Sequence, residues 1–113
     1  MILVYRPPSS DIVCFSEIFE DVLVNVSKEY ENICIFGDFN IPSINWNDDS
    51  YTSSVASNSL FCNVVNEFSL QQLNRTPSNA KGNILDLVFT NSLLQSFSLI
   101  FINILQSCQL ITL

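Results

Sequence analysis

The chain has 113 residues, which is enough for one domain. Hydrophobic residues make up 48% of it, so the chain can bury a core and is not expected to be disordered. With 11 acidic residues, four basic residues and a net charge of −7, this chain alone is poorly suited to binding nucleic acid, whose phosphates need Lys or Arg. The absence of histidine excludes Ser-His-Asp catalysis, HExxH sites and zinc sites with histidine ligands.

The cysteines show neither a metal-binding nor a disulfide pattern. Cys14, Cys34, Cys62 and Cys108 form no CxxC pair, and each has apolar neighbours. We therefore predict buried, reduced thiols.

Residues 2–5 are predicted to form a strand, and a strand that begins with the chain suggests that the natural start lies upstream. The first residues lack the basic region and the long apolar stretch of a signal peptide, so we expect an intracellular location. Pro7 and Pro8 end the strand, because proline cannot continue a central strand.

Residues 11–27 are predicted to form an amphipathic helix that packs on a sheet. Its N-terminus can be capped by Asp11 or by the two serines before it. The apolar positions that recur at helical spacing are Ile12, Phe15, Phe19, Val22, Leu23 and Val26. The acidic residues lie largely off this stripe, which indicates a solvated face.

The most informative segment is residues 33–40, Ile-Cys-Ile-Phe-Gly-Asp-Phe-Asn. Its apolar first half predicts a buried strand. If strand geometry continues through Phe39, Asp38 and Asn40 project together from the strand end while Phe39 points into the core. A carboxylate beside a carboxamide on a strand end can orient a water, a metal ion or a phosphate oxygen. The alternative is a plain turn, since Gly, Asp and Asn all favour turns.

The middle of the chain is predicted to be a long polar loop, a second helix and a short strand. The loop covers residues 41–58, and a loop of this length is usually functional or disordered. We interpret Trp46 within it as a hydrophobic peg rather than a substrate-facing ring. An amphipathic helix is predicted over 59–68, capped by Ser57 or Ser59, and a strand over 70–73.

A second acid-bearing strand is predicted over residues 84–90, after a loop at 75–82. Asp86 lies inside this apolar run, where an ionised carboxylate is costly unless it is hydrogen-bonded or paired. The two glycines of the chain, Gly37 and Gly82, stand directly before the two acid-bearing segments. Asp86 is therefore the second polar position that needs an explanation.

The last 22 residues, 92–113, contain no charge. Polar side chains interrupt them at Gln95, Asn103, Gln106 and Gln109, which argues against a membrane span. We predict a buried strand near 97–104 followed by an irregular end.

Three segments match one family in the same order. They are Val4-Tyr5-Arg6-Pro7-Pro8, Ile35-Phe36-Gly37-Asp38-Phe39-Asn40 and Asn83-Ile84-Leu85-Asp86-Leu87-Val88-Phe89-Thr90-Asn91. Together they resemble the endonuclease/exonuclease/phosphatase superfamily, and more narrowly the endonuclease domain of non-LTR retrotransposons. The resemblance covers residues 1–95 as a partial domain and leaves 96–113 as a divergent apolar tail.

The resemblance implies an α/β (α+β) fold, a partial four-layered α/β sandwich in which this chain forms one sheet with two covering helices. It also implies a metal-dependent phosphodiesterase, with Mg²⁺ as cofactor and DNA as the partner of the intact family. Asp38 matches the residue that helps to activate water, and Asn40 the residue that orients the phosphate; both are also weak candidate metal ligands. Asp86 matches a residue that supports a catalytic histidine, and Tyr5 matches a tyrosine near the phosphate.

The departures from the family are as informative as the matches. The family carries a metal-binding Glu upstream of the first segment and a closing Ser-Asp-His segment, and this chain has neither. We therefore expect the C-terminal half of a DNA-nicking endonuclease with little or no activity alone. The alternatives are a non-catalytic transposon remnant and a small membrane-attached protein that uses the apolar tail.

Overall fold

The computed structural model describes residues 1–92 and 111–112, which form a five-stranded sheet, a two-stranded sheet and two main helices. The large sheet has the order β5-β6-β2-β1-β7, with β1 at Ile2–Tyr5, β2 at Cys34–Asp38, β5 at Gln71–Gln72, β6 at Asp86–Thr90 and β7 at Ile111–Thr112. The small sheet pairs β3 (Ile44–Asn45) with β4 (Thr52–Ser53). The helices are α1 (Ile12–Ser27) and α2 (Ser59–Glu67), the latter preceded by the 3₁₀ turn η1 (Ala56–Asn58).

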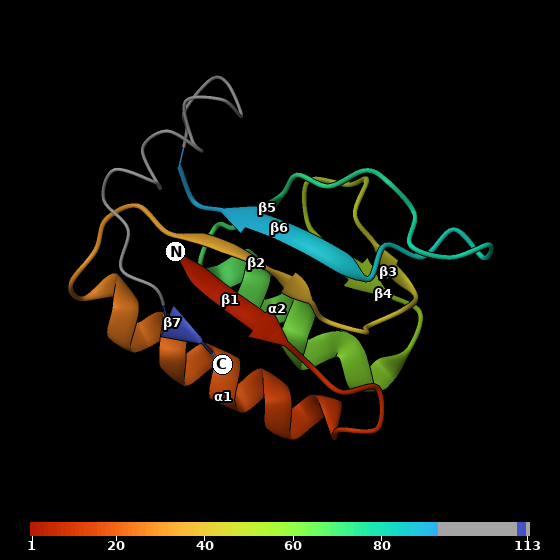
Figure 1. The fold of residues 1–113 in the computed structure, drawn as a ribbon, viewed down its shortest axis with the longest axis horizontal. Coiled ribbons are helices and arrows are strands. Elements are labelled where there is room, and N and C mark those ends of the chain that lie inside the picture. Colours follow the sequence, from red (N-terminus) through yellow and green to blue (C-terminus); the bar gives the residue numbers. More distant parts are fainter. Residues whose placement is uncertain (93–110, 113) are drawn as a thin grey trace.

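Both helices lie on one face of the large sheet (Figure 1). Strand β1 runs parallel to β2 and β7, so α1 is the crossover that a parallel β1–β2 pair requires. Strand β6 is antiparallel to both β2 and β5. The prediction of an α/β (α+β) fold with two helices covering a sheet is confirmed, and the structure adds a second, two-stranded sheet that was not predicted.

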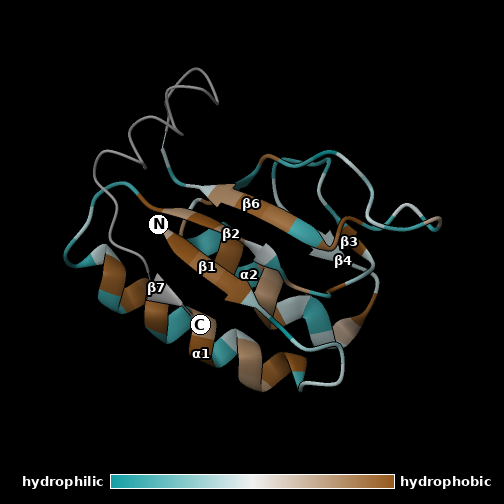
Figure 2. Ribbon diagram, in the orientation of Figure 1, coloured by the Kyte–Doolittle hydropathy of each residue, from teal (hydrophilic) through white to brown (hydrophobic). Residues whose placement is uncertain are grey.

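The core lies between the helices and the sheet, and phenylalanine rings form its centre. Phe19 of α1, Phe61 of α2 and Phe89 of β6 are fully buried, and each packs on Phe39 with ring centroids 5.5–5.7 Å apart. Figure 2 shows the hydrophobic colouring of β1, β2 and β6 between polar loops. Because buried aromatic rings carry much of the apolar area of a small domain, this cluster ties the sheet to both helices.

The expected helices are present, and the expected cap is confirmed for α1 but not for α2. Asp11 caps α1, accepting hydrogen bonds from the backbone N–H groups of Val13 (2.8 Å) and Cys14 (3.2 Å). The expected serine cap of α2 is wrong, because Asn58 occupies the cap position without a side-chain bond to the helix. The 3₁₀ turn η1 runs directly into α2, and the backbone N–H of Ser59 donates to the Ala56 carbonyl of that turn instead of to a serine side chain.

The structure also corrects two local expectations and confirms a third. Strand β6 begins at Asp86, so Ile84 and Leu85 belong to the loop before it. The segment 41–58 is not a plain loop but contains the β3–β4 hairpin. Trp46 within it is only 5% exposed and contacts Tyr51 and Phe89, as expected of a hydrophobic peg.

The cysteines are less uniform than predicted. Cys34 and Cys62 are buried free thiols, and burial raises the pKa of Cys34 to about 11. Cys14 is exposed, because it lies on the solvent side of α1. Cys108 and the strand predicted near 97–104 lie outside the described residues. Within the part of the chain that is described, no helix is long and apolar enough to cross a membrane.

Candidate functional site

Three of the four predicted site residues lie in one row across three neighbouring strands, where β1 and β2 end and β6 begins. Strand register pairs Tyr5 of β1 with Asp38 of β2, and Asp38 with Asp86 of β6. Paired residues of adjacent strands point to the same face of a sheet. The neighbouring positions Val4 and Leu87 are buried toward the helices, so the row faces the opposite side, here called the open face.

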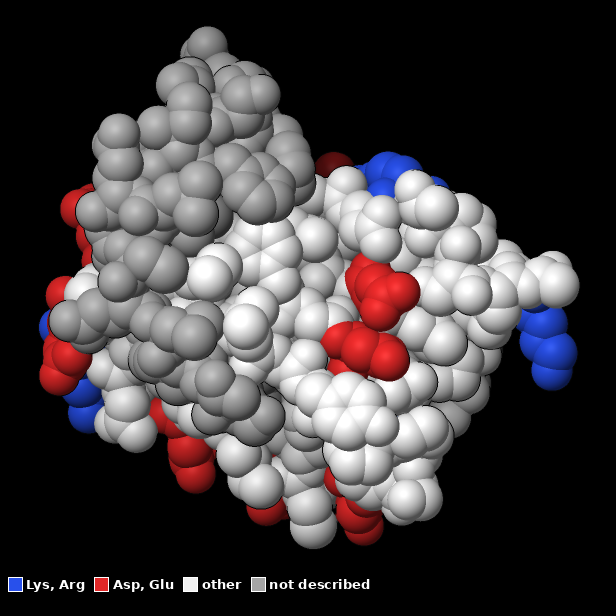
Figure 3. Space-filling model, in the orientation of Figure 1, with Lys and Arg blue, Asp and Glu red and all other residues white. Residues whose placement is uncertain are grey.

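Asp38 and Asp86 are placed especially close. The backbone N–H of Phe39 donates to the Leu85 carbonyl (2.9 Å), a bond that flanks the Asp38–Asp86 pair. The two aspartates are therefore a non-hydrogen-bonded antiparallel pair, the kind in which Cα atoms are about 4.5 Å apart and side chains approach most closely. Figure 3 shows two acidic side chains in contact near the centre of the open face. Because strand register puts Asp38 opposite Asp86 on the open face, the two carboxylates face the same solvent region.

The Gly-Asp-Phe-Asn segment is both a strand end and a turn. Strand β2 ends at Asp38, whose Oδ1 accepts a hydrogen bond from the Asn40 backbone N–H (3.2 Å), while Phe39 is fully buried. Asn40 has a left-handed φ of 49°, which asparagine tolerates better than most residues. Strand geometry therefore does not continue through Phe39, although Phe39 points into the core as expected.

Asn40 is tied to the neighbouring strand rather than left free. Its side-chain nitrogen Nδ2 donates to the carbonyl oxygen of Arg6, which follows β1, at 2.6 Å. The side-chain oxygen can take a cation, and the second hydrogen of Nδ2 can donate to a phosphate oxygen. An Asn40 in the phosphate-orienting role would therefore act from a carboxamide whose orientation is already set by the protein.

Gly37 is required by the close approach of β1 and β2. A Cβ atom at this position would overlap the Val4 carbonyl oxygen and come within 2.7 Å of the carbonyl carbon and 2.9 Å of the Val4 Cα. Those atoms are backbone and cannot rotate away. Glycine at position 37 thus lets the Tyr5–Asp38 pair form one residue further along.

Asp86 is exposed on the open face, so the cost that we expected for burying its carboxylate does not arise. Its Oδ2 accepts a hydrogen bond from the Ser78 hydroxyl (3.3 Å). The same hydroxyl oxygen accepts the backbone N–H groups of Leu85 (3.0 Å) and Asp86 (3.3 Å), and Asn74 Nδ2 donates to the Asp86 carbonyl (2.6 Å). The loop at 75–82 therefore folds back to hold the start of β6.

Two residues that hold the site in place, Ser78 and Arg6, were not predicted from the sequence. Ser78 gave no usable signal, because a serine in a polar loop is ordinary. Arg6 did give one: a basic residue between an apolar strand and two prolines is unusual, and in the structure it is 6% exposed. Burial lowers the pKa of Arg6, while the nearby Asp11 opposes that shift.

The donor atoms of the site suit a hard cation in kind but are few. Asp38 and Asp86 offer carboxylate oxygens and Asn40 a carboxamide oxygen, the ligand types that Mg²⁺ prefers. Within the described residues, however, no group of three or more His, Cys, Asp or Glu residues could hold a metal ion. A cation here would have to take further ligands from water or from a phosphate.

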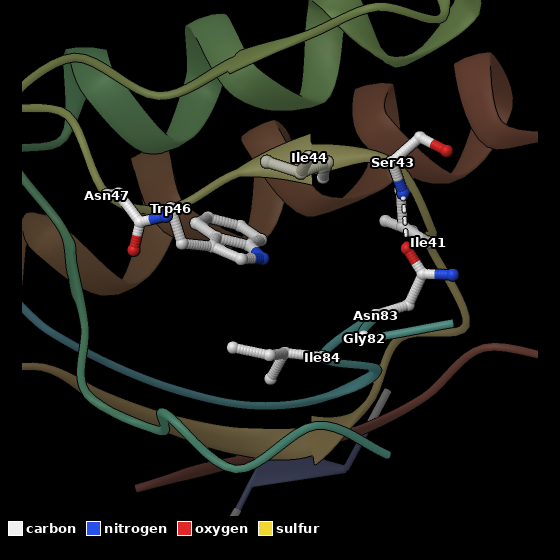
Figure 4. A pocket seen from close by; sticks show the side chains of 8 residues that line it. All are labelled: Ile41, Ser43, Ile44, Trp46, Asn47, Gly82, Asn83 and Ile84. Carbon is white, nitrogen blue, oxygen red and sulfur yellow. Dashed lines mark hydrogen bonds between the residues drawn. The ribbon is translucent and has the colours of Figure 1, made fainter. Parts of the chain in front are cut away.

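A small pocket opens beside the loop that follows Asn40 (Figure 4). Its volume is about 100 Å³, and its lining residues are Ile41, Ser43, Ile44, Trp46, Asn47, Gly82, Asn83 and Ile84. The Asn83 side-chain oxygen accepts the Ser43 backbone N–H (3.1 Å), which closes one side. None of Tyr5, Asp38 and Asp86 lines it, so this pocket lies outside the row that these three residues form.

Comparison with known proteins identifies the family. A family model described as endonuclease-reverse transcriptase matches residues 1–109, nearly the whole chain. No curated protein and no solved structure matches the chain. The match passes residue 95, and the boundary predicted there stays a prediction. The chain belongs to the endonuclease-reverse transcriptase family, within the endonuclease/exonuclease/phosphatase superfamily of non-LTR retrotransposons.

Proposed function

We propose that the open face carries part of the active site of a DNA-nicking, metal-dependent phosphodiesterase. The observation that supports this most directly is the row formed by Tyr5, Asp38 and Asp86, with Asn40 directly after it. Side chains that lie far apart in the sequence come together on three adjacent strands, and the family is a nuclease family. The Asp38 and Asp86 carboxylates would hold Mg²⁺ together with a substrate phosphate.

Each residue has a role that its position allows. The Asp38 carboxylate would accept a proton from the attacking water, and the Asn40 carboxamide would orient the phosphate. Tyr5 is 61% exposed beside Asp38, so its hydroxyl can reach a phosphate oxygen in solvent. When bound, Mg²⁺ would supply positive charge to the phosphate and lower the pKa of a bound water.

We further propose that this chain alone turns over little or no DNA. It has no imidazole to act on the attacking water or on the charge that develops at phosphorus. The chain has four basic and 11 acidic residues, and one of the basic residues, Arg6, is buried. Its net negative charge would therefore repel a DNA duplex. The non-catalytic transposon remnant is the limiting case of this proposal: a chain that keeps the family fold and has no turnover.

A nicking assay tests the proposed lack of turnover. Supercoiled DNA is incubated with the chain and Mg²⁺ or Mn²⁺, beside an Asp38→Ala variant and an Asp49→Ala control that removes an exposed acid elsewhere. We expect all three to nick at the same background rate. Metal-dependent nicking that disappears in Asp38→Ala but persists in Asp49→Ala would contradict the proposed lack of turnover. It would show that the site residues of this chain suffice for nicking without a histidine.

A binding experiment tests the site itself. Paramagnetic Mn²⁺ broadens the NMR signals of nearby amides, and we expect it to broaden Asp38 and Asp86 before other acidic positions. The Asp86→Asn variant should weaken this broadening at Asp38, because it removes one of two carboxylates. Broadening confined to Asp48 and Asp49, or spread evenly over all acids, would contradict the assignment of the site.

A further inference from the structure

One residue outside β2, Arg6, is bonded to every residue of the Asp38–Asn40 turn. Its backbone N–H donates to the Asp38 carbonyl (2.8 Å), and its own carbonyl accepts Asn40 Nδ2 (2.6 Å). Its side-chain Nη1 donates to the carbonyl oxygens of Asn40 (2.8 Å) and Phe39 (3.3 Å). The two side-chain bonds are charge-assisted and therefore stronger than bonds between neutral groups.

The Arg6 side chain is held in this place from the other side as well. Nη2 donates to the Ser10 carbonyl (2.7 Å), and Cζ lies 5.9 Å from the centre of the Phe15 ring. A further donor of the same side chain, Nε, is buried and has no hydrogen-bond partner among the described residues. Burying a charged group is costly, and an unpartnered donor adds to that cost, so the bonds made by Nη1 and Nη2 must offset it.

We infer that Arg6 is a positioning residue of the site: its buried guanidinium fixes the left-handed Asn40 and, through Asn40, the direction of the Asp38 carboxylate. The connection is continuous, because the Asn40 backbone N–H donates to Asp38 Oδ1. Asn40 has a φ of 49°, which is unfavourable without such support. The inference rests on the proposed function for what the site binds, whereas the contacts themselves belong to the folded chain.

Two variants separate positioning from general stabilisation. Arg6→Met keeps the length of the side chain without charge or donors, and Arg6→Lys keeps the charge but loses the planar fork that reaches several carbonyls. Val64→Ala, a cavity in α2 that removes none of the turn's hydrogen bonds, serves as a control for lower stability. The readout is NMR hydrogen exchange at the Asn40 backbone amide relative to the amide of Ile35 in the preceding strand, β2.

In Arg6→Met we expect exchange at Asn40 to rise about tenfold or more relative to Ile35, since two charge-assisted bonds are lost. Arg6→Lys should restore little of the protection, and Val64→Ala should leave the ratio unchanged. In the native chain the Arg6 Nη signals should show slowed rotation. An unchanged exchange ratio in Arg6→Met or Arg6→Lys would overturn the inference. If neither variant folds, freely averaging Arg6 Nη signals in the native chain would overturn it.

The Mn²⁺ titration then connects the turn to the site. Apparent Mn²⁺ affinity at Asp38 should fall about fivefold or more in Arg6→Met, by analogy with the loss caused by removing second-layer support of a ligand. It should not fall in Val64→Ala. Equal affinities in the native chain and in Arg6→Met would refute the positioning role. Absence of Mn²⁺ binding in the native chain would instead count against the proposed function, while the exchange ratio still decides whether Arg6 holds the turn.

Discussion

Asp38 and Asp86 present two carboxylates side by side, an arrangement that sheets usually avoid because like charges directly opposite each other are destabilising. Each carboxylate accepts a hydrogen bond from a neutral group, the Asn40 backbone N–H and the Ser78 hydroxyl. Neutral donors reduce the repulsion without cancelling it. The Asp38–Asp86 pair therefore lowers the free energy of unfolding relative to an uncharged pair at the same positions, as is common for functional sites.

Removing one of these charges should stabilise the protein. We expect Asp86→Asn to raise the free energy of unfolding by about 0.5 kcal/mol in the presence of a chelator, because asparagine can still accept the Ser78 bond. Asp49→Asn, which removes the same charge from an exposed position, should change it little. Urea unfolding followed by the fluorescence of Trp46, the single tryptophan, measures both. A loss of stability in Asp86→Asn would show that the carboxylate itself is structural.

Gly37 and Gly82 are needed for different reasons, and the two glycines can be compared directly. Gly37→Ala introduces a Cβ against the Val4 backbone and should cost about 3 kcal/mol or prevent folding. In Gly82→Ala the added Cβ has no atom of the described residues within 4 Å apart from its chain neighbours, so only the φ of 82° is unfavourable, at about 1 kcal/mol. The same urea titration compares the two variants. Equal losses would contradict the steric explanation for Gly37.

At the scale of elements, β5 shows how a two-residue strand can be held firmly. Gln72 is 1% exposed, and its side chain donates to the Asn74 carbonyl (2.7 Å) and accepts the N–H groups of Asn74 (2.7 Å) and Val88 (3.2 Å). Its backbone N–H donates to the Tyr51 hydroxyl (2.9 Å). A buried amide whose nitrogen and oxygen both have hydrogen-bond partners joins β5, β6 and the segment before α2.

Gln72→Met should therefore destabilise the fold although it preserves size. The loss of three hydrogen bonds leaves partly buried polar groups unpaired, for which we expect a loss of about 2–3 kcal/mol in the free energy of unfolding. The neighbouring Gln71 is exposed on the same strand, so Gln71→Met is a matched control and should change stability by less than about 0.5 kcal/mol. Thermal unfolding of the two variants decides between them. Similar melting temperatures would mean that the Gln72 bonds contribute little.

Sequence reasoning located the elements whose signal is periodic and missed those that depend on distant partners. The spacing of Phe15, Phe19 and Leu23 was sufficient for α1, because a helical stripe is a local property. The β3–β4 hairpin was not foreseen, since two-residue strands leave no alternation to detect. For the site, residue type pointed to Asp38 and Asp86, but their direct pairing depends on the register of β2 and β6. The contacts of Arg6 were equally invisible, because they join residues 33 and 34 positions apart.

At the scale of the whole molecule, the two faces of the large sheet differ in how they are covered. The face with Ile2, Ile35 and Phe89 is sealed by the helices, and all three side chains are at most 1% exposed. On the open face, Leu3 is 38% exposed and Tyr5 61%. An apolar sheet face that reaches solvent favours association with another surface. The candidate site lies on this same face, so whatever covers Leu3 also borders Asp38.

The open face should therefore make the protein prone to self-association. We expect the native chain to bind a hydrophobic dye and to show concentration-dependent association in sedimentation, because apolar surface next to Leu3 can be buried between molecules. Leu3→Lys places a charge in that surface and should reduce both effects. Ile18→Lys is the control: Ile18 is 58% exposed, but it lies on α1, on the other side of the sheet. A native chain that stays monomeric, melts cooperatively and ignores the dye would mean that the open face is already adequately covered, and the site would then be less accessible to DNA than proposed.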